Sequence, residues 1–131
     1  MHAVFDRLSA YQPQALAVLR IVSALLFIEH GTQKFFNFPP AEQPFGDLMN
    51  LIGLAGGLEV VGGILLLIGL FTRPVAFVLC GFMAVAYFMA HAPQSFFPVN
   101  NRGDAAILFC FVFLYLTAAG PGAFALDNRN R

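Results

Sequence analysis

Two short segments of the chain share one pattern of residues that can take part in chemistry. They read HGTQKFF at His30–Phe36 and HAPQSFF at His91–Phe97, so both have the form His-x-x-Gln-x-Phe-Phe. A histidine exchanges a proton near neutral pH, and a glutamine donates and accepts hydrogen bonds. Each copy ends a long apolar run. We expect the two copies to supply two half-sites for one ligand.

Charged residues adjoin the first copy and not the second. Glu29 and Gln33 form one i,i+4 pair, and His30 and Lys34 form another, which gives two adjacent polar stripes on one helix end. The predicted site is therefore lopsided. Its ligand-binding residues come from both copies and from the loop that follows the second, namely Glu29, His30, Gln33, Lys34, His91, Asn101 and Asp104.

The composition places these residues in a membrane protein. Of the 131 residues, 59% are hydrophobic and 11% are charged, against about 25% charged in soluble domains. Seven basic and seven acidic residues leave no net charge, so no nucleic-acid partner is indicated. The lipid bilayer is the predicted surrounding.

Four apolar runs supply the elements that must position the polar residues. Runs of about 17–24 residues cross a hydrocarbon core of about 30 Å. A soluble bundle is disfavoured because the second and third runs have almost no polar stripe. We predict an all-α fold, an integral membrane four-helix bundle in a single domain (1–131), with helices at about 15–36, 48–71, 75–91 and 105–119.

The order of motifs recurs along the chain. Each His-x-x-Gln-x-Phe-Phe copy is followed by a loop and then by Gly-Asp, at Gly46–Asp47 and at Gly103–Asp104. An Asp at a helix start is explained by capping alone, and chance similarity in a Phe-rich chain is the other alternative. The matched order favours a duplicated helical hairpin with halves related by a pseudo-twofold axis along the membrane normal.

Two further charged residues lie inside the apolar runs. Glu59 is near the middle of the second run, and its neighbours one turn away on both sides are Ala or Gly. Arg20 lies about two turns inside the first run. Since a lone charge in hydrocarbon costs several kcal/mol, we predict a buried ion pair between Arg20 and Glu59, serving either structure or function.

Cysteine and metal chemistry are not indicated by the spacing. Cys80 and Cys110 have apolar neighbours, and we interpret them as small packing residues rather than as a disulfide. The histidines and carboxylates form no compact ligand motif such as HExxH, so no metal site is predicted.

The distribution of basic residues predicts the orientation. With four spans both termini lie on one side, and this side carries more basic residues than the other: Arg7, Arg73, Arg129 and Arg131 against Lys34 and Arg102. Cytoplasmic termini are therefore predicted, which places both His-x-x-Gln-x-Phe-Phe copies near the outer face.

Over nearly its whole length the sequence resembles the DoxX family of small bacterial four-helix membrane proteins. The segments that carry the resemblance are LRIVSALLFIEHGTQKFF, GLEVVGGILLLIGLFTRPVA and NNRGDAAILFCFVFLYLTAAGPGAFALD. Their marks are Arg20, His30, Gly31, Gln33, Lys34, Glu59, Asn101, Gly103, Asp104, Gly120, Pro121, Gly122, Leu126 and Asp127. Asp104 stands where the family more often has Glu.

The resemblance implies a multi-pass protein of the bacterial inner membrane. The family takes its name from a membrane subunit of a thiosulfate:quinone oxidoreductase, so the resemblance implies a redox subunit with a soluble or membrane redox partner protein. A quinone requires hydrogen-bond donors, a titratable group and flat apolar walls, and the predicted cluster supplies these types of group. It is the one cofactor we expect.

Two other functions remain open. One is a small transporter of protons or a polar solute, which would have to form a homo-oligomer because four helices enclose little lumen. The other is a structural membrane assembly factor. The GxxxG motif at Gly53 and Gly57 fits helix contacts inside one chain or between protomers.

The orientation is tested by labelling. With cytoplasmic termini, a cysteine introduced at Asn128 resists a membrane-impermeant thiol reagent in intact cells, whereas one introduced at Glu42 reacts. The reverse pattern would invert the orientation and move the polar cluster to the cytoplasmic face.

Overall fold

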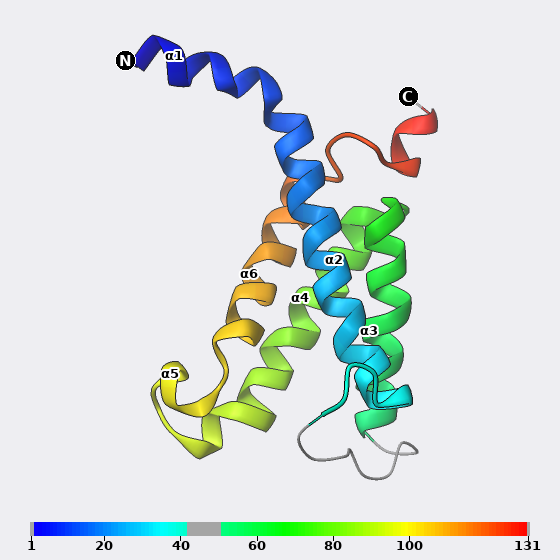
Figure 1. Cartoon of the computed structure of the whole chain (residues 1–131), viewed down its shortest axis with the longest axis vertical. Helices are drawn as coiled ribbons and strands as arrows, with labels where there is room; N and C mark the ends of the chain where they lie inside the picture. Colours follow the sequence, from blue (N-terminus) through cyan, green and yellow to red (C-terminus); the bar gives the residue numbers. More distant parts are fainter. Residues whose placement is uncertain (1, 42–50, 131) are drawn as a thin grey trace. The chain divides into compact units, whose positions relative to one another are not determined.

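The computed structural model describes residues 2–41 and 51–130, in which every regular element is a helix (Figure 1). The predicted all-α membrane fold is confirmed. In chain order the elements are α1 (His2–Arg7), η1 (Leu8–Tyr11), α2 (Gln12–Phe36), α3 (Leu51–Ile68), α4 (Thr72–Ala86), η2 (Tyr87–His91), η3 (Ala92–Gln94), α5 (Pro98–Asn101), α6 (Asp104–Ala119) and η4 (Leu126–Asn130).

The helical stretches have the length and composition of membrane spans. Three of them are long and apolar enough to cross a membrane, namely His2–Phe36, Leu51–Ile68 and Thr72–Gln94. The fourth, α6, is apolar but has 16 residues, which at 1.5 Å per residue is about 24 Å. Large apolar side chains stay exposed along all four helices, as expected for surfaces in contact with lipid.

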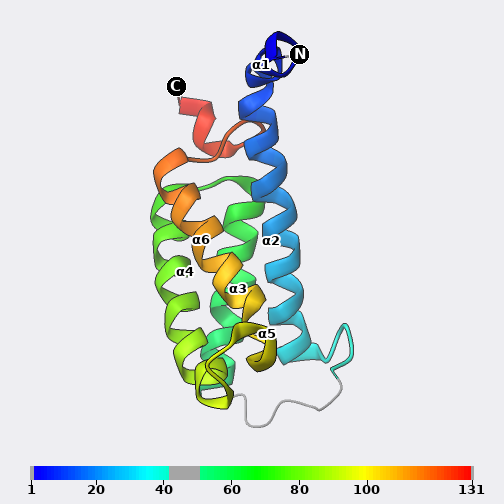
Figure 2. The same ribbon diagram turned by 90° about the vertical axis from the view of Figure 1, so that its left-hand side faces the viewer.

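The chain divides into two compact units, and each is built on one helical hairpin. The first unit comprises Met1–Phe71 and Pro121–Arg131, and the second comprises Thr72–Gly120. Within the first, α2 packs against α3, and within the second, α4 packs against α6 (Figures 1 and 2). The chain is thus organised as two hairpins, while the symmetry axis between them stays a prediction.

Small residues bring the two helices of the first hairpin close together. A Cβ atom added to Gly31 of α2 would lie 2.6 Å from Val60 Cγ2 and 2.9 Å from the carbonyl oxygen of Gly56. A Cβ added to Gly56 would lie 2.8 Å from the Phe35 ring. Neither position has room for a side chain, because side-chain or backbone atoms of the facing helix already lie within 3 Å of the added Cβ atom. These contacts fix the register, with the end of α2 opposite the first half of α3.

Two helix boundaries differ from the sequence-based prediction for local reasons. The second span was expected to end at residue 71, but α3 ends at Ile68 because Gly69 has φ of +70°, the left-handed conformation that ends helices. The third span begins at Thr72 rather than at 75, with Pro74 tolerated in its first turn. It then continues to His91 as a π-helical turn. The predicted start at 48 and the Gly46–Asp47 motif lie outside the described residues.

An arginine closes the end of the second hairpin. Arg73, at the start of α4, donates hydrogen bonds to the carbonyl oxygens of Thr117 and Ala118 in the last turn of α6. These carbonyls have no partner within their own helix, and a cation there also suits the negative end of the helix dipole. Next in the chain, Gly120 has φ of +83° and passes against the same guanidinium.

The close approach of α2 and α3 predicts opposite responses at two glycines of the first hairpin. Gly31→Ala forces a methyl group against Val60 and a backbone carbonyl, so it lowers the free energy of unfolding by about 1–3 kcal/mol. Gly57→Ala is the matched control, because a Cβ there meets nothing within 4 Å. It leaves the melting temperature in detergent unchanged or slightly raised. Equal losses in the two variants would contradict the described register.

Candidate functional site

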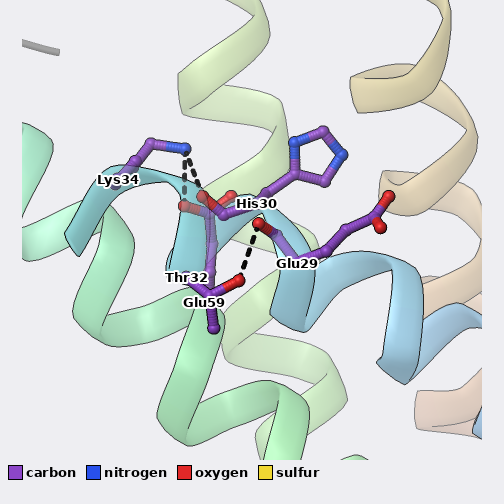
Figure 3. A network of polar contacts seen from close by, with 5 residues as sticks. All are labelled: Glu29, His30, Thr32, Lys34 and Glu59. Carbon is purple, nitrogen blue, oxygen red and sulfur yellow. Dashed lines mark hydrogen bonds and ion pairs between the residues drawn. The ribbon is translucent and has the colours of Figure 1, made fainter. Parts of the chain in front are cut away.

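A buried ion pair joins the two helices of the first hairpin (Figure 3). Lys34 Nζ of α2 lies 2.7 Å from Glu59 Oε1 of α3, and the two side chains are only 16% and 6% exposed. The same ammonium group donates a 3.4 Å hydrogen bond to the carbonyl oxygen of His30. The pair therefore lies one turn from the end of α2, next to the half-buried His30.

The expected partner of Glu59 was wrong. Arg20 and Glu59 are both buried as predicted, but Glu59 pairs with Lys34. The register explains the difference, because Gly31 of α2 lies against Glu59 whereas Arg20 lies against Gly69. Arg20 is 11 residues before Gly31 in the same helix, which is about 16 Å along its axis.

Three further polar residues of α2, namely Glu29, Thr32 and Gln33, do not take part in the Lys34–Glu59 pair. The side chain of Glu29 is exposed and points away from the Lys34–Glu59 pair (Figure 3). Thr32 donates hydrogen bonds to the carbonyl oxygens of Glu29 (3.1 Å) and Phe38 (2.7 Å). Gln33 Nε2 donates to the carbonyl of Pro39 at 3.1 Å. Gln33 therefore holds the segment after α2, while His30 and Lys34 lie beside Glu59.

Arg20 organises the opposite end of the same hairpin. Its guanidinium donates hydrogen bonds to the carbonyl oxygens of Pro121, Ala123 (3.0 Å) and Phe124 (2.8 Å). These residues belong to the last segment of the chain, 121–130, which folds onto the first unit. A second tie comes from Asp127, whose carboxylate accepts a 2.8 Å bond from the backbone N–H of Phe71. The sequence marked these positions through Gly-Pro-Gly and Leu-Asp without indicating their role.

In the second unit a buried amide organises the turn after α4. Asn101 is fully buried, and its Nδ2 donates to the Tyr87 hydroxyl at 3.0 Å and to the Ser95 carbonyl at 2.9 Å. Its Oδ1 accepts from the Gly103 N–H at 2.8 Å. His91 Nδ1 lies 3.0 Å from the backbone oxygen of Asn101, and the His91 ring stacks on Tyr87. Asn101 is thus a structural centre whose side-chain hydrogen bonds are made within the protein.

The other predicted residues of the second unit lie at its surface. Asp104 is exposed at the first position of α6. Gln94 is exposed and donates to the carbonyl of Ala90 in its own segment. His30 and His91 belong to the first and second units respectively, so their meeting at one ligand stays a prediction. Within residues 2–41 and 51–130, no three His, Cys, Asp or Glu side chains gather as metal ligands do.

One pair of residues that sequence reasoning assigned to packing alone lies in direct contact. Cys80 of α4 and Cys110 of α6 are free thiols with their sulfur atoms 3.7 Å apart. Thirty residues separate them in the chain, and only the register of the second hairpin brings them together. The sequence held one signal, namely that the only two cysteines of the chain both lie inside apolar runs.

Paired apolar helices with charges buried at their ends define an all-α integral membrane protein. The DoxX family profile matches residues 15–92, more than half of the chain, and the chain belongs to the DoxX family. It is 47% identical to an uncharacterized protein of Haemophilus influenzae, over 95% of this chain and 96% of that protein. It is 30% identical to the inner membrane protein YphA of Escherichia coli, over 92% and 93% of the two chains.

A third relative is the uncharacterized membrane protein Rv3486 of Mycobacterium tuberculosis, 29% identical over 93% of this chain and 85% of that protein. No solved structure matches the chain significantly. The resemblance read from the sequence is confirmed at the level of the family.

The buried ion pair predicts non-additive stability. Lys34→Met or Glu59→Leu leaves one uncompensated charge between α2 and α3, so each lowers the free energy of unfolding by about 3–5 kcal/mol. The double variant recovers most of this loss because no charge remains buried. Thermal unfolding in detergent measures all three, with Glu29→Leu as control since that carboxylate is exposed on the same helix. Losses that add in the double variant would refute the pairing.

Proposed function

We propose that this protein is an inner-membrane subunit of a redox complex and binds a quinone or a similar flat carbonyl compound at the end of α2. Both termini lie in the cytoplasm in this proposal, and a redox partner protein exchanges electrons with the bound compound. Residence in the inner membrane is supported by the name of the relative YphA. The binding site consists of His30, Lys34 and Glu59, with Phe35 as an apolar wall.

The observation that carries the proposal is the buried Lys34–Glu59 pair, whose ammonium also bonds the backbone carbonyl of His30. An ammonium group held in an apolar hairpin is a strong hydrogen-bond donor to a carbonyl oxygen, because little water competes for it. Reduction of a quinone also takes up protons. Glu59 bonds this ammonium and His30 belongs to the same helix end, so the site has a hydrogen-bond donor and two titratable groups.

The surroundings of the pair also suit a flat ring. The Phe35 ring covers Gly56 of the facing helix, and Phe36 follows it with the ring centroids 6.3 Å apart. Ligand sites of this class are mostly apolar with a few placed polar groups. The Lys34–Glu59 pair supplies such polar groups, and the Phe35 and Phe36 rings supply apolar surface.

The transport alternative fits the first hairpin less well. A conducting path would need polar groups between the Lys34–Glu59 pair and Arg20. Between these two centres the buried residues are apolar or glycine, namely Ala24, Phe27, Gly62, Gly63 and Leu66. The one polar exception is Ser23. This apolar spacing supports the interpretation of the Lys34–Glu59 pair and Arg20 as two separate sites rather than as parts of one conducting path.

The test measures quinone that co-purifies with the protein. Protein extracted in mild detergent is expected to retain quinone at near-stoichiometric amounts. His30→Ala and the Lys34→Met, Glu59→Leu double variant lower that amount about tenfold or more, because each removes a charge-assisted or proton-exchanging contact. The double variant keeps its folding stability, so its loss reports binding.

The matched control is Gln94→Ala, which removes the glutamine of the second His-x-x-Gln-x-Phe-Phe copy. Gln94 Nε2 donates to the backbone carbonyl of Ala90, so this change leaves the retained quinone unchanged. Protein without quinone that carries a solute across sealed liposomes would overturn the redox proposal in favour of transport. Absence of both activities would leave the assembly role.

A further inference from the structure

The second hairpin places the only two cysteines of the chain side by side. Cys80 is in the middle of α4 and Cys110 in the middle of α6, with the sulfur atoms 3.7 Å apart. Both thiols are reduced, and both are half-buried. Small residues also meet at helix contacts, but a dithiol requires this close approach of two sulfur atoms, and the second hairpin provides it.

The geometry is close to that of a disulfide. The S–S bond is about 2.05 Å long, so the sulfur atoms must approach by about 1.7 Å, which is less than 1 Å for each side chain. Movement of this size is available from small changes in the side-chain torsions.

The position in the membrane limits what reacts with the pair. Both cysteines lie inside apolar helices, so charged soluble thiols reach them poorly. A reactant dissolved in the bilayer approaches from the side of the hairpin. Beside Cys80, the exposed Gly81 leaves open space, since a Cβ atom there would meet nothing within 4 Å.

We propose that Cys80 and Cys110 form a redox-active dithiol that closes to an intramolecular disulfide when a membrane-soluble quinone oxidises it. The thiol pair rests on the contact between the sulfur atoms, and the choice of oxidant rests on the proposed function. The dithiol stores two electrons on this chain. These electrons are additional to the ones that a partner protein supplies.

The reaction balances between one dithiol and one quinone. The two S–H bonds break and one S–S bond forms, so both sulfur atoms are oxidised. The two electrons and two protons pass to the quinone, whose two carbonyl oxygens become the hydroxyl groups of the quinol. No third reactant is needed.

The experiment uses the full chain in detergent, fully reduced and then freed of reductant. One sample is treated with a short-chain benzoquinone and another with diamide, a general thiol oxidant. Thiols that remain are alkylated and counted by intact mass, and the quinol formed is measured by absorbance. The proposal predicts loss of both alkylation sites together, one quinol per protein, and recovery of both thiols with dithiothreitol.

Single variants supply the control. Cys80→Ser and Cys110→Ser each keep one thiol, which stays open to alkylation and yields no quinol. A single covalent quinone adduct on either variant or on the native protein would show simple addition to a thiol and overturn the dithiol.

The outcomes separate this inference from the proposed function. Oxidation by diamide and not by the quinone would confirm the pair and overturn the quinone as its oxidant. If both thiols stay reduced with either reagent, the dithiol is refuted, and co-purified quinone then decides the proposed function independently. Cross-linked dimers in place of the internal disulfide would also refute it.

Discussion

An ionised side chain inside an apolar helix pair needs a partner within the protein, and the first unit is arranged around this requirement. Lys34 and Glu59 neutralise each other across α2 and α3. Arg20 donates hydrogen bonds to three backbone carbonyls of residues 121–124. One charge centre thus holds two helices together, and the other holds the last segment of the chain onto them.

The two copies of the repeated motif have diverged in what they do. Gln33 bonds the segment that leaves α2, whereas Gln94 bonds its own helical turn. His30 lies beside a charged pair, while His91 contacts the backbone of the neutral, fully buried Asn101. The lopsided character expected from the charges therefore extends to the hydrogen bonds. The charged chemistry is concentrated in the first unit, and the thiol chemistry in the second.

The sequence predicted the helices and the buried charges because both follow from local composition. It failed where the answer depended on register. The predicted partner of Glu59 was wrong because a single sequence shows which positions are small but not which residues of α2 face them. The contact between Cys80 and Cys110 was missed for the same reason, since the sequence does not show that two residues 30 positions apart face each other. The hydrogen bonds of the Asn101 side chain to Tyr87, Ser95 and Gly103 also become visible only in the folded turn, while its binding of a ligand stays a prediction.

The bonds from Arg20 to the last segment also have a consequence for the order in which the molecule is completed. Arg20 is synthesised 101 residues before Pro121, which at about 5–20 residues per second is an interval of roughly 5–20 s. During that interval α2 enters the membrane with a guanidinium whose final carbonyl partners have not yet been made. Until residues 121–124 follow, the guanidinium needs hydrogen-bond acceptors other than these carbonyls. Synthesis of the first unit therefore begins before the second unit is made and is completed only after it.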